Sequence, residues 1–245
     1  MEVLIRRSAE AVADEGLAVI SAELARKPDL AVGLATGRTP LALYAKLRPL
    51  DWTRATFFNL DEYVGLGPAH PKSFHKYLHD HFLVGVAAGR VRLFRGDSRD
   101  LEAEASSVEG AIRTAGGIDV QILGIGRDGH IGFNEPTSSF GSRTRVKTLS
   151  KETLADAGDV PIHAITMGIG TILEAKRIVL LATGEAKAEA VREAVEGPVT
   201  SMCPASALQL HPSATVIVDD AAAVRLARRD YYKFVDENKW KVAKR

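Results

Sequence analysis

The chain has 245 residues, a formal net charge of +1 and 46% hydrophobic residues. This length and composition suit one α/β domain with a full hydrophobic core, and we expect residues 1–245 to form a single domain. Binding to a phosphate backbone requires a clustered excess of Lys and Arg, so the balanced charge excludes a typical nucleic-acid-binding protein.

The cysteine content and the apolar runs bear on the compartment. The lone cysteine, Cys203, excludes an intramolecular disulfide, favours a reducing compartment and is interpreted as a small packing residue. The N-terminus has too short an apolar run for a signal peptide, and no segment reaches the roughly 20 apolar residues of a membrane span. We therefore expect a cytoplasmic protein without membrane contacts, and interpret the locally basic residues 225–245 as a solvated helix end.

Short apolar runs alternate along the chain with stretches that carry apolar residues at helical spacing. The predicted strands are residues 3–5, 30–34, 55–59, 118–123, 178–182 and 215–218, and the clearest predicted helices are 9–26, 100–115 and 185–196. This alternation predicts an α/β fold: a single open, mostly parallel, twisted sheet with helices on both faces. Ligands of such sheets bind outside the carboxyl ends of the strands, so the loops after the strands are the candidate site.

The first such loop is ATGRTP, residues 35–40, where Pro40 suits the first turn of a helix. Free N–H groups at a helix N-terminus, together with hydroxyls and a guanidinium, favour an anion, most simply a phosphate. The candidate phosphate-binding residues are Thr36, Gly37, Arg38 and Thr39. Taken alone, the pattern slightly favours an ordinary capped strand-to-helix turn.

The next loop, NLDEYVG at residues 59–65, places the acids Asp61 and Glu62 at the end of a strand, where one of them could act as a base. Several histidines follow, of which His75 and His79 are four residues apart and could share one helix face. Two such ligands can begin a metal site, but no glutamate completes an HExxH arrangement and no cysteine is near. We interpret them as a partly exposed helix face and expect no metal.

The polar run GIGRDGHIGFNEP, residues 124–136, directly follows a predicted buried strand. Asp128, His130 and Glu135 are close enough in sequence to share one hydrogen-bond network. A histidine between two carboxylates has its imidazolium form favoured, which suits proton transfer near neutral pH. The four glycines at 124, 126, 129 and 132 are expected to adopt positive φ and to let the backbone approach a ligand.

Two other interpretations of this run remain. The cluster could be a structural histidine on a surface turn. The spacing GxGxxG at residues 124–129 is also the dinucleotide-binding pattern, but that pattern requires a helix at the third glycine and an acidic residue about twenty positions later. No helix is expected at the third glycine, because HIGFNEP follows it. No acidic residue is expected at the required distance, because residues 143–147 are basic.

The last loop of interest is TGEAK, residues 183–187, which places Lys187 in the first turn of a helix. The helix macrodipole disfavours a cation at that position. A bound anion would explain the lysine, and a solvated lysine is the simpler alternative.

Five blocks of the chain resemble the glucosamine-6-phosphate deaminase family: residues 33–40, 58–66, 126–136, 142–147 and 207–212. They occur in the family's order and cover most of the chain. The resemblance implies a Rossmann-like deaminase/isomerase fold and an aldose–ketose isomerisation with deamination of glucosamine 6-phosphate to fructose 6-phosphate and ammonia. It implies a phosphorylated amino sugar as partner and no cofactor, and it leaves monomer and homo-oligomer open.

The resemblance also implies roles for individual residues. Asp61 would move a proton from C2 to C1 of the opened sugar, by way of an enolamine. His130 would open the pyranose ring, with Asp128 and Glu135 orienting it. Residues 36–39 and Lys187 match the family's phosphate-binding positions.

The chain departs from the family in the segment 154–161, which is shorter than the usual lid and lacks the arginine expected to bind the substrate phosphate. Without that arginine, phosphate recognition should be weaker, because a lysine offers the phosphate only a point charge. Arg38 is the candidate to replace the missing guanidinium. Ser138, Arg145 and Lys147 match positions that bind an activator in regulated family members. A matching site does not establish allostery, and the shortened segment argues against regulation.

Three alternative functions remain open. The first is a deaminase for galactosamine 6-phosphate or another amino-sugar phosphate. The second is a 6-phosphogluconolactonase, which carries a similar GxDGH loop but needs no base at Asp61. The third is a sugar-phosphate sensor, which would call for a DNA-binding segment that residues 1–29 have little room to hold.

Overall fold

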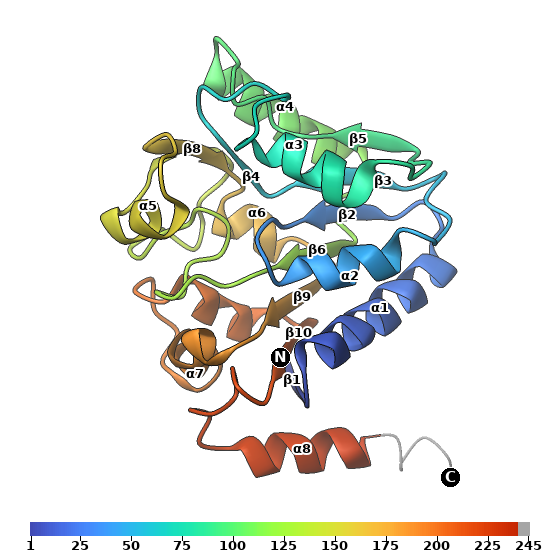
Figure 1. Ribbon diagram of the computed structural model, residues 1–245, viewed down its shortest axis with the longest axis vertical. Coiled ribbons are helices and arrows are strands. Elements are labelled where there is room, and N and C mark those ends of the chain that lie inside the picture. The colour runs from blue at the N-terminus through green and yellow to red at the C-terminus, as the bar shows by residue number, and fades with distance from the viewer. Residues whose placement is uncertain (240–245) are drawn as a thin grey trace.

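The computed structural model describes residues 1–239, which form a seven-stranded parallel sheet surrounded by helices (Figure 1). The strand order is β1-β10-β9-β6-β2-β3-β5, and every neighbouring pair is parallel. The strands are β1 (Glu2–Arg6), β2 (Ala31–Leu34), β3 (Thr56–Asn59), β5 (Arg90–Arg92), β6 (Val120–Leu123), β9 (Arg177–Ala182) and β10 (Ala214–Asp219). All six predicted strands are confirmed. The edge strand β5 was not predicted, because its sequence Arg-Val-Arg is short and largely exposed.

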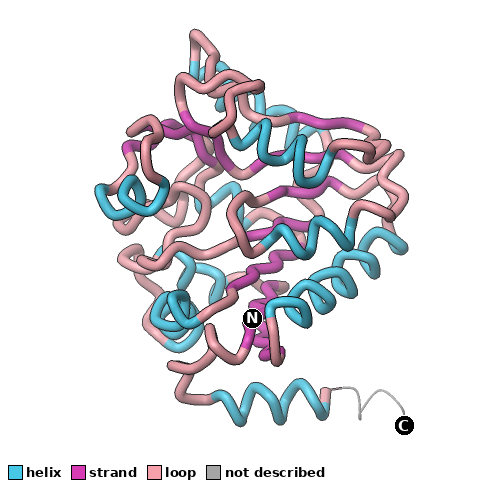
Figure 2. Tube along the Cα trace, viewed as in Figure 1, coloured by secondary structure: helices cyan, strands magenta, loops and turns pink. Residues whose placement is uncertain are grey.

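Helices fill most of the connections between strands (Figure 2). They are α1 (Ala9–Arg26), α2 (Pro40–Leu47), α3 (Phe74–Leu78), α4 (Leu101–Thr114), α5 (Lys151–Ala157), α6 (Ile169–Leu173), α7 (Ala188–Glu196) and α8 (Arg229–Asn238), with the π-helix η1 (His79–Leu83) and the 3-10 helices η2 (Glu185–Lys187) and η3 (Pro204–Leu210). Side-chain caps start several of them: Ser8 accepts a hydrogen bond from the N–H of Ala11, and Asp100 from that of Ala103. None of the helices described within residues 1–239 is both long and apolar enough to cross a membrane.

A second, three-stranded antiparallel sheet, not predicted from the sequence, stands beside the first. It pairs β4 (Asp61–Tyr63) with β8 (His163–Thr166), and β8 with β7 (Arg145–Thr148). The stretch 59–65 was expected to be a loop, yet β4 lies within it. These strands are short and mix polar with apolar residues, and they form only because about 100 residues of intervening chain return β8 to β4.

The strand order determines where a ligand can bind. The chain adds β3 and β5 on one side of β2 and then places β6 on the other side of β2, followed outward by β9 and β10. The direction of winding therefore reverses between β2 and β6. In open α/β sheets the crevice at the carboxyl ends of such a pair is the usual binding site.

The last described helix lies beside the first strand. Helix α8 lies next to β1 (Figure 1), and Arg6 donates a 2.6 Å hydrogen bond to Asp236. The predicted solvated helix end is α8, which has no fully buried residue, while residues 240–245 of that basic stretch lie outside the described part.

Candidate active site

A cavity of about 350 Å³ lies at the carboxyl ends of β2, β3 and β6, where the strand order reverses. Its volume falls within the range of small-molecule sites. The residues predicted from sequence that line it are Thr36, Gly37, Arg38, Thr39, Asp61, His130 and Lys187. The structure thus brings the predicted phosphate-binding residues together with Asp61 and His130 in one cavity, whereas Asp128 and Glu135 contact His130 without lining the cavity.

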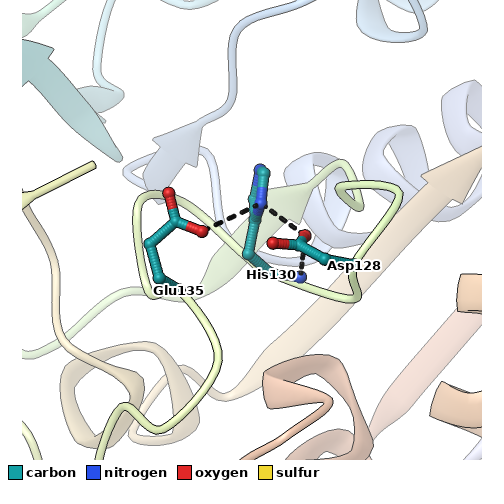
Figure 3. A group of neighbouring side chains, drawn as sticks. All are labelled: Asp128, His130 and Glu135. Carbon is teal, nitrogen blue, oxygen red and sulfur yellow. Dashed lines mark hydrogen bonds and ion pairs between the residues drawn. The ribbon is translucent and has the colours of Figure 1, made fainter. Parts of the chain in front are cut away.

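Asp128 and Glu135 flank the imidazole of His130 (Figure 3). Nδ1 of His130 lies 2.7 Å from Oδ1 of Asp128 and 3.8 Å from Oε2 of Glu135. The backbone N–H of His130 also donates to Oδ1 of Asp128 at 3.2 Å. Both carboxylates therefore lie on the Nδ1 side of the ring, which leaves Nε2 as the nitrogen that could exchange a proton with a ligand.

The pKa of Asp128 reports the same interaction. Partial burial alone would raise this pKa, but the contact with His130 and the charge of that imidazole outweigh burial and hold the pKa well below the usual range. Asp128 therefore stays ionised beside the imidazole of His130.

Glycines keep the loop after β6 close to this network, though for different reasons. Gly129 and Gly132 have the expected positive φ, of 82° and 57°, whereas Gly124 and Gly126 do not, so for those two the expectation was wrong. Gly126 is required for space: a Cβ there would lie 2.3 Å from Nδ1 of His130. A Cβ on Gly129 would lie 2.5 Å from Sγ of the buried Cys203, which confirms Cys203 as a packing residue.

The dinucleotide-binding interpretation of residues 124–129 fails on structure. The third glycine, Gly129, leads into turns and an isolated bridge between Ile131 and Asn134, and no helix begins there. The missing helix N-terminus is the element that would hold a pyrophosphate.

Asp61 begins β4, where it is 5% exposed and lines the cavity. Its Oδ1 is buried and has no hydrogen-bond partner among the described residues. Burial, followed by the charge of Glu62, raises the pKa of Asp61 well above its usual value. Asn59 fixes the backbone at this point, since its Nδ2 donates to the carbonyl of Asp61 and its Oδ1 accepts from the N–H of Phe94, both at 2.7 Å.

The neighbouring acid Glu62 serves the fold. Its carboxylate accepts hydrogen bonds from Oγ of Ser73 at 2.6 Å and from the N–H groups of Phe74 at 3.0 Å and His75 at 2.8 Å. It thereby satisfies free N–H groups at the start of α3. Of the two acids, only Asp61 retains an unpaired oxygen in the cavity.

The loop after β2 leads directly into α2, with Thr39 at the N-cap and Pro40 in the first turn as predicted. Tyr77 holds the loop from α3 by donating from its hydroxyl to the carbonyl of Gly37 at 2.5 Å. Arg38 is exposed, and its side chain makes no hydrogen bond or ion pair with any residue in the described range 1–239.

Lys187 closes η2 and precedes α7, close to the predicted position. Burial lowers the pKa of Lys187, and the charges of Asp156 and Asp128 counteract part of that effect. No carboxylate of the described chain forms an ion pair with its ammonium group. A half-buried, unpaired cation at the cavity wall suits a bound anion.

The short segment 154–161 belongs to a lid that we define as residues 150–161, built around α5. Ser150 starts α5 by accepting from the N–H of Thr153 at 3.1 Å, and Gly158 ends it with a φ of 80°. Leu154 packs on the apolar cluster that includes Tyr63 and Phe133, which seats the lid on the second sheet. Thr153, Asp156 and Ala157 line the cavity.

Arg127 was not predicted from the sequence. It lines the cavity, and its Nε donates to Oδ2 of Asp156 in the lid at 3.0 Å. The signal was its position in the glycine-rich run, one residue before Asp128.

The residues matched to an activator site lie outside the cavity lining. Ser138 is buried and its Oγ has no partner among residues 1–239. Arg145 on β7 donates to Oδ1 of Asn134 at 2.9 Å, and burial lowers its pKa. Lys147 lies two residues further along β7. The activator site stays a prediction.

Asp128, His130 and Glu135 are also the one group in the described chain whose geometry could hold a metal, with ligand atoms within 4.8 Å of one another. His75 and His79 fall on α3 and η1 and join no such group within residues 1–239. The expectation that the protein needs no metal stays a prediction.

Comparisons with known proteins identify the family of the chain. The family model described as glucosamine-6-phosphate isomerases/6-phosphogluconolactonase matches residues 6–217. A glucosamine-6-phosphate deaminase of Arthrobacter sp. (strain FB24) is 46% identical over 254 residues, covering 98% of each chain, and one of Hahella chejuensis is 49% identical over 259 residues, covering 99% of this chain and 98% of that one.

Solved structures show the same relationship. A monomeric glucosamine-6-phosphate deaminase superposes with a TM-score of 0.89 and 41% identity, covering 91% of this chain and 99% of that one. A 6-phosphogluconolactonase from Trypanosoma brucei reaches a TM-score of 0.77 at 20% identity, covering 92% and 98%, which shows a shared fold alone.

Proposed function

The chain belongs to the family of glucosamine-6-phosphate isomerases and 6-phosphogluconolactonases, and we propose that it converts glucosamine 6-phosphate and water to fructose 6-phosphate and ammonia. The deaminase relatives at 46% and 49% identity support this choice within the family. The observation that carries it is Asp61, a buried carboxylate with one unpaired oxygen, in the wall of the cavity that His130 also lines. A lactonase has no proton to move between carbons and gives such a base no task.

The two ends of the cavity suit the two ends of the substrate. In this proposal the phosphate binds at the start of α2, near residues 36–39, with Lys187 on the facing loop. Free N–H groups of a helix N-terminus and an unpaired ammonium favour a dianion. The sugar then extends toward His130 and Asp61.

His130 is proposed to open the ring. Its Nε2 gives a proton to the ring oxygen as the bond between C1 and that oxygen breaks, and then takes up the proton that the C1 hydroxyl loses, so the open-chain aldehyde forms and the histidine regains its proton. Asp128 and Glu135 lie on the Nδ1 side of the ring and orient it, so that Nε2 can donate a proton and later accept one.

Asp61 is proposed to carry out the isomerisation. Its carboxylate removes the proton from C2, which gives an enolamine between C1 and C2, and returns a proton to C1. The resulting imine at C2 adds water and releases ammonia, which leaves the ketone of fructose 6-phosphate. Only protons and one water molecule are exchanged, so the steps balance without a redox partner.

The test is to incubate the purified protein with glucosamine 6-phosphate and to follow ammonia and fructose 6-phosphate together. Galactosamine 6-phosphate and 6-phosphogluconolactone are assayed in parallel. Equal amounts of ammonia and fructose 6-phosphate from glucosamine 6-phosphate are expected. If only galactosamine 6-phosphate released ammonia, the substrate would be galactosamine 6-phosphate instead of glucosamine 6-phosphate. Turnover of the lactone without ammonia release would replace the proposal by the lactonase alternative.

We also propose that the protein is located in the cytoplasm. The one cysteine is buried and unpaired, so a reducing compartment does not weaken the fold. Cell fractionation with activity as the marker tests this.

A further inference from the structure

The cavity contains three basic side chains, Arg38, Arg127 and Lys187, which differ in their partners. Arg38 and Lys187 form no ion pair with any residue from 1 to 239, whereas Arg127 is paired with Asp156 of the lid. Asp156 is therefore a carboxylate placed at the wall of a cavity that otherwise favours anions. Its charge opposes a bound phosphate unless it can move away.

The geometry of this pair is that of anion recognition. Nε of Arg127 donates to Oδ2 of Asp156 at 3.0 Å, and Nη2 donates to Oδ1 of the same carboxylate. A guanidinium that binds a carboxylate through two parallel N–H groups binds two phosphate oxygens in the same way. The two side chains are 60% and 49% exposed, so the pair is screened by water and contributes little stability.

Arg127 and Lys187 line the same cavity, so one ligand could contact both side chains. The charges of both Arg127 and Asp156 act on the ammonium group of Lys187, which puts the three groups in one electrostatic cluster. Arg127 projects from the loop after β6, which borders the phosphate loop after β2 across the switch point.

We propose that Arg127 is a phosphate-binding residue of the active site and that Asp156 occupies its guanidinium only until the substrate phosphate displaces it. This inference rests on the proposed function for the identity of the substrate. It gives a guanidinium to the phosphate although α5 itself carries no arginine. It also makes the lid responsive to substrate, since phosphate binding releases α5 from the loop after β6.

The alternative is that the pair is a strut that holds the lid in place. The two roles differ in the effect of removing Asp156. If Asp156 competes with phosphate, its neutralisation strengthens phosphate binding, while loss of Arg127 weakens it. If the pair is a strut, both changes loosen the lid in the same way and shift binding in the same direction.

The experiment measures binding of inorganic phosphate and of fructose 6-phosphate by calorimetry, and KM and kcat for glucosamine 6-phosphate. Arg127→Gln is expected to raise Kd and KM about ten- to a hundredfold, the usual effect of losing a charge-assisted hydrogen-bonded pair. Arg127→Lys should fall between Arg127→Gln and the parent. Asp156→Asn is expected to lower Kd for both ligands.

Asp159→Asn is the matched control, because Asp159 pairs the same lid with Lys72 at 3.0 Å. It should leave Kd and KM unchanged. Melting temperatures of all variants exclude misfolding as the cause. Weaker binding in both Asp156→Asn and Arg127→Gln, or an unchanged Kd in Arg127→Gln, would overturn the inference.

These outcomes remain distinct from the fate of the proposed function. If the protein releases no ammonia but Arg127→Gln loses phosphate binding, the proposed reaction fails and the phosphate role of Arg127 stands. If ammonia is released and phosphate affinity is independent of Arg127, the inference fails alone.

Discussion

Asp61 owes its reactivity to its neighbours in sequence and in space. Strand β4 buries it, and Asn59 holds the backbone so that one carboxylate oxygen stays free in the cavity. Asp61→Asn keeps the shape and removes the base, so we expect kcat to fall by roughly 10²–10⁴-fold. Initial rates of ammonia release measure this. Fructose 6-phosphate should still bind within a few-fold of the parent affinity, and substantial remaining activity would assign the base elsewhere.

The same residue predicts the pH dependence. Burial and the negative charge of Glu62 raise the pKa of Asp61, so the base becomes protonated at a higher pH than an ordinary carboxylate. We expect kcat/KM to decline on the acid side at a pH well above 4, the usual range of such groups. Removing the negative charge lowers the pKa of Asp61, so Glu62→Gln should move this acid limb to lower pH.

Glu62 also caps α3, so the variant requires a check on folding. Circular dichroism and melting temperature provide it, and Ser73→Ala removes one bond of the same cap while keeping the charge. An acid limb that moves equally in Ser73→Ala would attribute the effect to the cap rather than to charge.

At the scale of elements, apolar runs determined what the sequence could predict. The six predicted strands of the central sheet are buried through most of their length, and α1 begins and ends at the predicted residues, 9 and 26. The second sheet was missed because β4, β7 and β8 carry no distinct period and exist only through pairing across the fold. Local sequence contains no information of that kind.

In the candidate site, too, local features could be predicted from the sequence, and features that depend on the fold could not. Asp128, His130 and Glu135 lie within eight residues, so their clustering could be predicted from spacing. The meeting of Asp61 with that loop depends on strand order and was reached through the resemblance. The pairing of Arg127 with Asp156 joins residues 29 apart and required the structure.

The loop after β6 gives a prediction about close packing. Gly126 touches the imidazole so closely that an added Cβ would lie 2.3 Å from Nδ1 of His130. Gly126→Ala must displace the ring from Asp128, and we expect kcat to fall at least about tenfold, as small misplacements of a catalytic group do. Gly141→Ala, with no atom closer than 3.9 Å to its Cβ and outside the cavity, is the control in the same connection. Equal kcat in the two variants would show that the ring tolerates the displacement.

At the scale of the whole molecule, Glu109 connects α4 with α6 and with the segment that leads into β7. Its Oε1 accepts from the N–H of Thr144 at 3.0 Å, from Oγ1 of Thr144 at 2.6 Å and from Oγ1 of Thr171 on α6 at 2.5 Å. Its Oε2 accepts from Arg143 at 2.6 Å. Thr144 directly precedes β7, so this carboxylate ties α4 and α6 to the sheet that carries Asp61.

The pKa of Glu109 predicts how this tie responds to acid. Burial would raise the pKa, but hydrogen bonds from Thr144, Thr171 and Arg143 lower it from 4.5 to about 2. A lowered pKa means that the contribution to stability is complete above pH 4.5 and is lost as the pH falls toward 2. Glu109→Gln should therefore reduce the free energy of unfolding by about 2 kcal/mol at pH 7, and by progressively less below pH 4. Urea unfolding at pH 7 and pH 3 measures both values, with Glu174→Gln, the exposed partner of Arg143, expected to change stability by under about 1 kcal/mol. An equal loss at both pH values would mean that Glu109 acts through its shape, because a charged tie must weaken as its carboxylate is protonated.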